Sequence, residues 1–196
     1  MIDRDAPTVP APRYPPYRIA FCGASGTGKT TAARWLAEQM KLPMNPVGSR
    51  SVAKEMGFAS PYDVDEANRR KEFQHNLQAR KIAWELEHDA FITDRTVLDD
   101  LAYTVMHDVK AVDEAYLARA IEHMKRYTHV VMCPVDVFCN TGTDAHRVHD
   151  LAYHRIFDAV VNGFCMEWCT AREVWMNSAS FEDRKRVLSE TFGLLG

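Results

Sequence analysis

The sequence predicts an α/β fold in which a mainly parallel sheet is covered by helices on both faces. Short apolar runs alternate along the chain with longer amphipathic segments, which is the order of elements in an open α/β sandwich. A glycine-rich turn follows the first apolar run directly, and a later apolar run ends in an acidic residue. Both features are typical of parallel strands whose carboxyl ends face a ligand.

The first elements are a strand over residues 17–22, rich in β-branched and aromatic side chains, and a helix over residues 29–41. Pro43 and Pro46 close this helix and frame a short extended segment over residues 44–47. Before them, residues 1–16 carry five prolines. Because proline fixes φ and lacks an amide donor, we expect a flexible N-terminal arm there.

The rest of the chain continues the alternation of strands and helices. In order, we expect one or two helices over residues 64–88, a strand at 90–94, helices at 97–107 and 113–126, a strand at 129–134, a helix at 148–163, a strand at 172–176 and a helix at 181–195. With the segment at 44–47 these make five strands. No internal repeat is visible, so residues 17–196 are expected to form a single domain.

Length and charge narrow the function classes. A chain of 196 residues can bury a full core as one domain. The formal net charge is −3, from 24 basic and 27 acidic residues, which does not favour a nucleic-acid partner. No apolar run approaches the about 18 residues that a membrane-spanning helix needs. An odd number of scattered cysteines, five in all, favours a reducing cytoplasm.

The glycine-rich turn carries the strongest functional signal. Its glycines permit a loop so tight that successive amides point inward and form an anion site at the start of a helix. Lys29 can then reach the β- and γ-phosphates of ATP, while the Thr30 hydroxyl can bind a Mg²⁺ ion that bridges them. The residues expected to bind the nucleotide are Gly23, Ala24, Ser25, Gly26, Thr27, Gly28, Lys29, Thr30 and Thr31.

An acid and an arginine, Asp94 and Arg95, stand where the strand at 90–94 ends, at the edge of the sheet where such folds bind ligands. Arg95 can make a two-pronged contact with a phosphate. Asp94 can orient a metal-bound water or accept a proton from an attacking hydroxyl. The alternative is a structural ion pair between the two side chains.

With these residues the chain resembles the P-loop nucleoside and nucleotide kinases, and most closely the thymidylate-kinase-like and phage deoxynucleoside monophosphate kinases. The resemblance rests on the phosphate loop and on Asp94-Arg95-Thr96 leading into a helix. It implies a three-layer P-loop NTPase fold with a five-stranded sheet and an arginine-bearing helical lid over about residues 135–163. Arg147 and Arg155 are the lid arginines it suggests, against the alternative of a solvated helix face. It also suggests a homodimer, because thymidylate-kinase-like proteins commonly pair.

For the acceptor, the resemblance points to the region between the second strand and the Asp-Arg element. There Arg50 is expected to bind an acceptor phosphate, and Phe73 and Gln74 to stack on and hydrogen-bond a nucleobase. The alternative for each of these three residues is an ordinary helix or loop residue without a role in binding. Arg69, Arg70 and Arg80 compete with Arg50, and Glu55 is a weak candidate for a general base.

A zinc site is a minor alternative. Cys165 and Cys169 lie one helical turn apart, and His146, His149 and His154 are near in sequence. However, no Cys-x-x-Cys pair occurs, and a buried thiol usually acts as a small apolar side chain.

The leading expectation is therefore a Mg²⁺-dependent enzyme that moves the γ-phosphoryl group of ATP to a (deoxy)nucleoside monophosphate. Lys29, Asp94, Arg95 and the lid arginines would form its catalytic group. A nucleoside kinase that acts on a sugar hydroxyl, a nucleotide-dependent switch or ATPase, and a module that binds nucleotide without turnover remain as alternatives.

Overall fold

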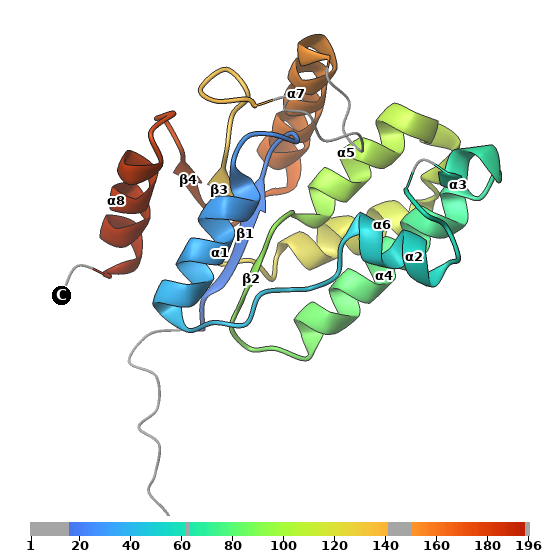
Figure 1. The fold of residues 1–196 in the computed structure, drawn as a ribbon. Coiled ribbons are helices and arrows are strands. Elements are labelled where there is room, and N and C mark those ends of the chain that lie inside the picture. The colour runs from blue at the N-terminus through green and yellow to red at the C-terminus, as the bar shows by residue number, and fades with distance from the viewer. Residues whose placement is uncertain (1–15, 62, 141–149, 195–196) are drawn as a thin grey trace, which may run out of the picture.

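The computed structural model describes residues 16–61, 63–140 and 150–194. Helices and strands alternate along them (Figure 1), as expected from the sequence. The elements are β1 (Arg18–Cys22), α1 (Lys29–Met40), α2 (Ser49–Glu55), α3 (Asp63–Glu66), α4 (Arg70–Leu86), β2 (Phe91–Thr93), α5 (Val97–Asp108), the short 3-10 helix η1 (Val109–Ala111), α6 (Glu114–Met124), β3 (His129–Met132), α7 (Leu151–Trp168), β4 (Arg172–Trp175) and α8 (Phe181–Phe192).

The strands form one parallel sheet in the order β2-β1-β3-β4. Alternate side chains of β1 point to opposite faces, as the two-residue period of a strand requires. Ile19 and Phe21 belong to one core cluster, whereas Ala20 and Cys22 belong to the other. Both faces of the sheet are therefore buried at β1, β2 and β3, whose sequences are nearly continuous apolar runs, whereas the edge strand β4 buries only Val174.

The helices cover the sheet in two layers. α1 and α8 supply Leu36 and Leu188 to the cluster on one face. α5, α6 and α7 supply Leu101, Tyr116 and Phe157 to the cluster on the other face. Figure 1 shows α1 and α8 on one side of the strands and α5, α6 and α7 on the other. The architecture is thus the three-layer α/β/α sandwich that the sequence predicts.

The expected five-stranded sheet needs one correction, because the sheet in the described part of the chain has four strands. The segment over residues 44–47 contributes a single parallel bridge, from Met44 to Ile92. The Ile92 amide donates to the Pro43 carbonyl at 2.9 Å, and the Asn45 amide donates to the Ile92 carbonyl at 2.8 Å. The next amide that could extend this ladder is that of Val47, because alternate residues face the partner strand, and it donates to Asn45 Oδ1 at 2.9 Å instead.

A third, small apolar cluster lies beside the sheet and joins α2, α3 and α4. It contains Val52, Ala53, Val64, Phe73 and Leu77. Helix α2 was not foreseen from the sequence. It has only seven residues and buries only Val52 and Ala53, so it offers too short a pattern for a 3.6-residue period to be recognised.

Two sequence expectations fall partly outside the described residues. The N-terminal arm at 1–16 is described only at Pro16, and the lid at 135–163 lacks residues 141–149. The described part of the lid includes the start of α7, where Phe157 and Val161 are fully buried in the core. The lid itself stays a prediction.

Among the described residues, no helix combines the length and the apolar character that crossing a membrane would require.

Candidate active site

The glycine-rich turn between β1 and α1 adopts the loop geometry that its glycines allow. Gly23, Gly26 and Gly28 have φ angles of 131°, 83° and 82°, in the left-handed region that other residues avoid. A Cβ atom at Gly23 would lie 2.5 Å from the Cys133 carbonyl oxygen. Only glycine fits there, because the loop runs against the backbone that follows β3.

A pocket of about 260 Å³ opens at this turn, and we call it the loop pocket. Lys29 lines it and is 4% exposed. In the structure its ammonium group donates to the Ala24 carbonyl and, at 3.2 Å, to the Thr27 hydroxyl. The lysine is therefore folded back along the loop that is expected to hold phosphates.

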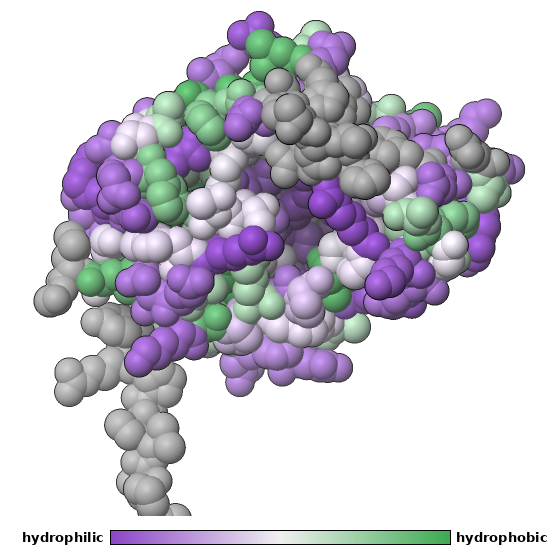
Figure 2. Space-filling view, viewed as in Figure 1, coloured by the Kyte–Doolittle hydropathy of each residue, from purple (hydrophilic) through white to green (hydrophobic). Residues whose placement is uncertain are grey.

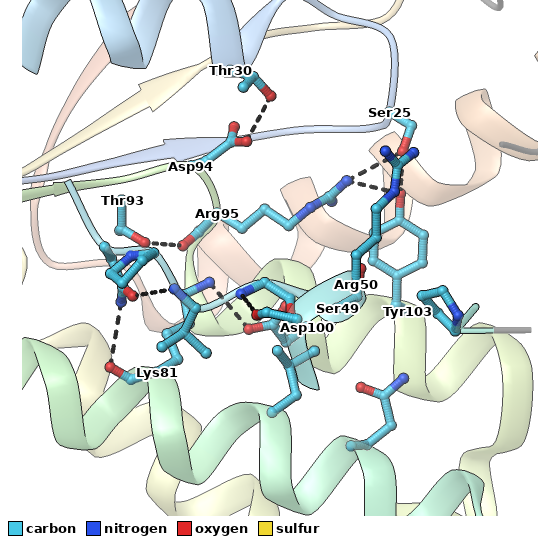
Figure 3. Close-up of a pocket in the computed structure, with 18 of the residues that line it drawn as sticks. Ser25, Thr30, Ser49, Arg50, Lys81, Thr93, Asp94, Arg95, Asp100 and Tyr103 are labelled. Carbon is cyan, nitrogen blue, oxygen red and sulfur yellow. Dashed lines mark hydrogen bonds and ion pairs between the residues drawn. The ribbon is translucent and has the colours of Figure 1, made fainter. Parts of the chain in front are cut away.

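Thr30 and Asp94 meet at the floor of the loop pocket. The Thr30 hydroxyl donates to Asp94 Oδ2 at 2.6 Å, as Figure 3 shows. Asp94 Oδ1 is buried and has no hydrogen-bond partner in the structure. A hydroxyl and a carboxylate with a spare buried oxygen are hard oxygen ligands, which Mg²⁺ prefers. These two residues thus fit the metal site expected from the sequence.

Arg95 extends across the loop instead of pairing with its neighbour Asp94. Its Nη2 donates to the Ser25 hydroxyl at 3.2 Å and to the Tyr103 hydroxyl at 3.4 Å (Figure 3). Its Nη1 lies 3.8 Å from Asp99 Oδ1 and, although buried, has no hydrogen-bond partner. Within the described part of the chain no ion pair joins Asp94 to Arg95, so the structural salt bridge considered from the sequence is not what the structure shows.

The capping of α5 fixes this arrangement. The Thr96 side chain accepts from the Asp99 amide, and Asp99 Oδ2 accepts from the Thr96 amide at 2.9 Å. The other oxygen of Asp99 accepts from the Gly23 amide at 3.0 Å. The Asp99 carboxylate thus connects the start of α5 to the start of the phosphate loop. It thereby fixes the position of Arg95, which directly precedes Thr96, relative to the loop.

A second pocket, with a volume of about 880 Å³, adjoins the first, and we call it the large pocket. The two share Ser25, Thr30, Thr31, Asp94 and Arg95 as lining residues. Figure 2 shows a hydrophilic hollow on this face of the molecule. A phosphate held in the loop pocket would therefore meet a second ligand beside Asp94 and Arg95.

The large pocket contains the expected acceptor residues Arg50, Phe73 and Gln74. Arg50 is exposed at its edge. Phe73 is 1% exposed and Gln74 is 3% exposed, and Gln74 Oε1 is buried without a hydrogen-bond partner. Arg70 lines the pocket too, but it is bound to the Asp65 carboxylate and to the Pro61 carbonyl.

Other residues weighed from the sequence lie elsewhere. Arg69 and Arg80 pair with Glu72 and Glu55 on the surface, and neither lines the two pockets. Glu55 lines neither pocket, so it is not placed to act as the general base. Arg155 is 62% exposed and pairs with Asp136 at 3.0 Å. Arg147, the preferred lid arginine, lies outside the described residues, as do His146 and His149.

The sequence did not single out a buried ion pair in the large pocket. Lys81 donates to Asp100 at 3.1 Å, and both side chains are at most 5% exposed. Burial raises the pKa of Asp100, while Lys81 and Arg95 oppose that rise. The spacing of polar residues along α4 could have indicated this buried pair from the sequence. Gln74, Gln78, Lys81 and Glu85 recur every three to four residues and form a buried polar stripe.

The cysteines give no metal site in the described residues, where no group of three or more His, Cys, Asp or Glu side chains is placed to hold an ion. Cys165 instead lies 3.8 Å from Cys22, sulfur to sulfur, in the core. His154 is buried in α7.

Comparisons with known proteins bear on the fold and the family of the chain. No curated protein matches the sequence. A deoxyadenosine kinase from M. mycoides, solved with dCMP and a flexible dCDP bound, has 15% identity and a TM-score of 0.55 over 90% of this chain and 97% of its own. A shikimate kinase from Aquifex aeolicus has 17% identity and a TM-score of 0.57, over 91% and 95%. The YorR protein from Bacillus subtilis, in complex with phosphorylated GDP, has 14% identity and a TM-score of 0.53, over 91% and 95%.

At such identities these structures establish a shared fold, which is the fold of the P-loop kinases. The family described as "AAA domain" matches residues 18–184. Its match includes β1, the phosphate loop, the Asp-Arg element and the start of α8. Since the match spans most of the chain, the protein belongs to this AAA-domain family.

Proposed function

We propose that the protein is a Mg²⁺-dependent phosphotransferase that moves the γ-phosphoryl group of ATP to a (deoxy)nucleoside monophosphate. The observation that supports this most is the meeting of the two pockets at Asp94 and Arg95. A donor in the loop pocket and an acceptor in the large pocket would be aligned there for transfer. Positioning of this kind supplies much of the rate in phosphoryl transfer.

On the donor side, the amides of the loop would hold the β-phosphate, and Lys29 would swing from the Ala24 carbonyl to the β- and γ-phosphates. Thr30 and Asp94 would hold Mg²⁺, whose charge would neutralise the phosphate oxygens. Arg95 would contact the transferred group with the Nη1 that now lacks a hydrogen-bond partner. Charges placed in advance where negative charge develops lower the barrier.

On the acceptor side, the charge of the large pocket supports a phosphorylated acceptor. Its lining includes five cationic side chains and two carboxylates: Arg34, Arg50, Arg70, Lys81 and Arg95 against Asp94 and Asp100. Two of the cations already have a carboxylate partner, Lys81 in Asp100 and Arg70 in Asp65, which leaves Arg34, Arg50 and Arg95 against Asp94. An excess of positive charge in a partly enclosed site favours an acceptor that carries a negative charge of its own.

Gln74 and the buried Lys81–Asp100 pair would then face the acceptor's base. The unpartnered Oε1 of Gln74 can accept a hydrogen bond, and the ion pair offers a donor and an acceptor side by side. Buried polar groups that gain partners only from a ligand give strong discrimination, because a ligand without the matching group leaves them unpaired.

A nucleoside kinase is the second candidate. Its support is the buried Asp94 Oδ1, which has no hydrogen-bond partner and lies where a sugar hydroxyl would deliver its proton. The same oxygen cannot both bind Mg²⁺ directly and accept that proton. The monophosphate reading avoids this conflict, because an acceptor phosphate is already ionised at neutral pH.

The test is phosphoryl transfer from ATP with Mg²⁺ to a panel of deoxynucleoside monophosphates, ribonucleoside monophosphates and the parent nucleosides, with the products separated by chromatography. A nucleoside diphosphate supports the proposal and names the base. A nucleoside monophosphate product replaces it with the nucleoside kinase. Bound nucleotide without any acceptor product rejects both and points to a switch or ATPase that needs a protein partner.

A further inference from the structure

Arg184, near the start of α8, is a buried cation that the proposed transfer reaction does not account for. Its side chain is 3% exposed. The Nε atom donates to the Ser178 carbonyl at 2.6 Å, and Nη1 donates to the Thr27 carbonyl at 2.6 Å. The guanidinium also stacks on Phe138, with 5.2 Å between its carbon and the ring centroid. It thus joins the phosphate loop to a helix 157 residues further along the chain.

Among the residues that the structure describes, none supplies a compensating negative charge to Arg184. In the described part of the chain, no carboxylate lies within 4.0 Å of its guanidinium, although Lys185 and Arg186 beside it both have acidic partners. Its Nη2 is buried and has no hydrogen-bond partner. A buried charge without a counter-charge is costly, and the amino end of a helix is an unfavourable place for a cation. An anionic ligand nearby would offset this cost.

The contact with Thr27 controls the direction of a loop amide. In a trans peptide the carbonyl and the following N–H point in opposite directions. When Arg184 holds the Thr27 carbonyl on its side, the Gly28 N–H is turned to the other side. Gly28 lines the loop pocket, so its amide is one of the donors expected to hold phosphate.

Gly28 also makes room for this contact. A Cβ atom at position 28 would lie 2.8 Å from Arg184 Nη1. Glycine is therefore needed there for two reasons: its φ of 82°, and the guanidinium that approaches from α8.

From these contacts we infer that Arg184 is a positioning residue for the donor nucleotide, which fixes the Thr27–Gly28 peptide and places an uncompensated positive charge behind the phosphate loop. This inference rests on the proposed function only in that the ligand is a nucleoside di- or triphosphate. The acceptor and the transfer step do not enter it. A purely structural link between α8 and the loop would give stability without nucleotide affinity.

The experiment compares ADP–Mg²⁺ binding by titration calorimetry in the wild type, Arg184→Ala, Arg184→Lys and the control Arg186→Ala. Arg186 lies on the same helix but is 59% exposed and pairs with Asp183 and Glu190. We expect Arg184→Ala to weaken ADP binding about ten- to a hundredfold, the size of a lost charged hydrogen bond. Arg184→Lys should recover little of it, because an ammonium group cannot bind two carbonyls as the planar fork does. Arg186→Ala should bind as the wild type does.

Millimolar methylguanidinium, added to Arg184→Ala, should restore part of the ADP affinity, because it returns the charge and the hydrogen-bond donors to the vacated site. A folded Arg184→Ala protein with unchanged ADP affinity would overturn the inference. If that variant does not fold, hydrogen exchange of the wild type decides: ADP must slow exchange in the peptide over residues 178–184, and no change overturns the inference. A wild type that binds neither ADP nor ATP would instead overturn the proposed function itself.

Discussion

The loop pocket and the large pocket share Asp94 and Arg95 but are built in different ways. The loop pocket comes mainly from one short stretch of chain, residues 25–31, with Asp94 and Arg95 after β2 and Phe138 and Asn140 from the segment after β3. The large pocket takes its lining from α1, the segment after it, α2, α4, α5 and the end of β2. One site is therefore a property of a local sequence, and the other is a property of the whole fold.

This difference determines how each pocket can fail. The loop pocket depends on backbone amides and on glycines with positive φ. Few of its residues can be replaced, because other residue types rarely adopt such φ angles. The large pocket depends on long side chains from several helices, which can be altered without disturbing the sheet. We expect mutations in the loop pocket to remove activity and mutations in the large pocket to change substrate preference.

The largest effect should come from Lys29→Ala. The lysine is the mobile cation of the loop, so its loss should lower kcat about 10²- to 10³-fold, as the loss of one transition-state donor does. Steady-state transfer to the best acceptor of the panel measures it, with circular dichroism as the check on folding. Lys125→Ala is the matched control, because Lys125 is 59% exposed, pairs with Glu122 and lines neither pocket. Normal turnover in Lys29→Ala would remove the loop from the reaction.

Arg95→Ala tests the point where the two pockets meet. We expect kcat to fall about 10²-fold while the Kd for ATP changes little, because the contact is made with the transferred group and not with the resting nucleotide. Arg80→Ala, on the surface pair with Glu55, is the control. Normal turnover in Arg95→Ala would mean that Arg95 has a structural role, through its hydrogen bonds to Ser25 and Tyr103.

Asp94→Asn should act through the metal. The amide keeps the shape of the side chain but loses its charge, so the Mg²⁺ concentration for half-maximal activity should rise about tenfold or more. Titration of activity with Mg²⁺ after treatment with EDTA measures this shift. Asp136→Asn, in an exposed residue, is the control. An unchanged Mg²⁺ dependence would show that Asp94 does not hold the metal.

What the sequence could predict follows the same division. The loop was readable because its eight residues, Gly23 to Thr30, are contiguous and their spacing alone defines the geometry. The parallel direction of the strands was predicted from their apolar runs, and the structure confirms it. Contacts between residues far apart in the sequence could not be predicted. Lys81 and Asp100 meet across two helices, and Arg184 reaches Thr27 from the far end of the chain. No local sequence pattern predicts such contacts, because only the folded chain brings these residues together.

The same limit applies to the fifth strand. Pro43 and Pro46 were interpreted as boundaries of an extended segment. Pro43 has no amide to continue the ladder before Met44, and the Val47 amide donates to the Asn45 side chain instead of to β2. Only the pairing of Met44 with Ile92 shows how little ladder remained.

The smallest effect, and the sharpest test of the large pocket, should come from Arg50→Ala. Arg50 is exposed at the edge of the large pocket, and Arg70, which lines the same pocket, is bound to Asp65. If Arg50 holds the acceptor phosphate, its loss should raise the KM for the acceptor about tenfold, with a smaller change in kcat and none in ATP affinity. Arg69→Ala, which breaks the surface pair with Glu72 and the contact with the Phe58 ring outside both pockets, should leave all three unchanged. A larger rise of KM in Arg70→Ala than in Arg50→Ala would reverse their order, and would mean that Arg70 exchanges the Asp65 carboxylate for the phosphate.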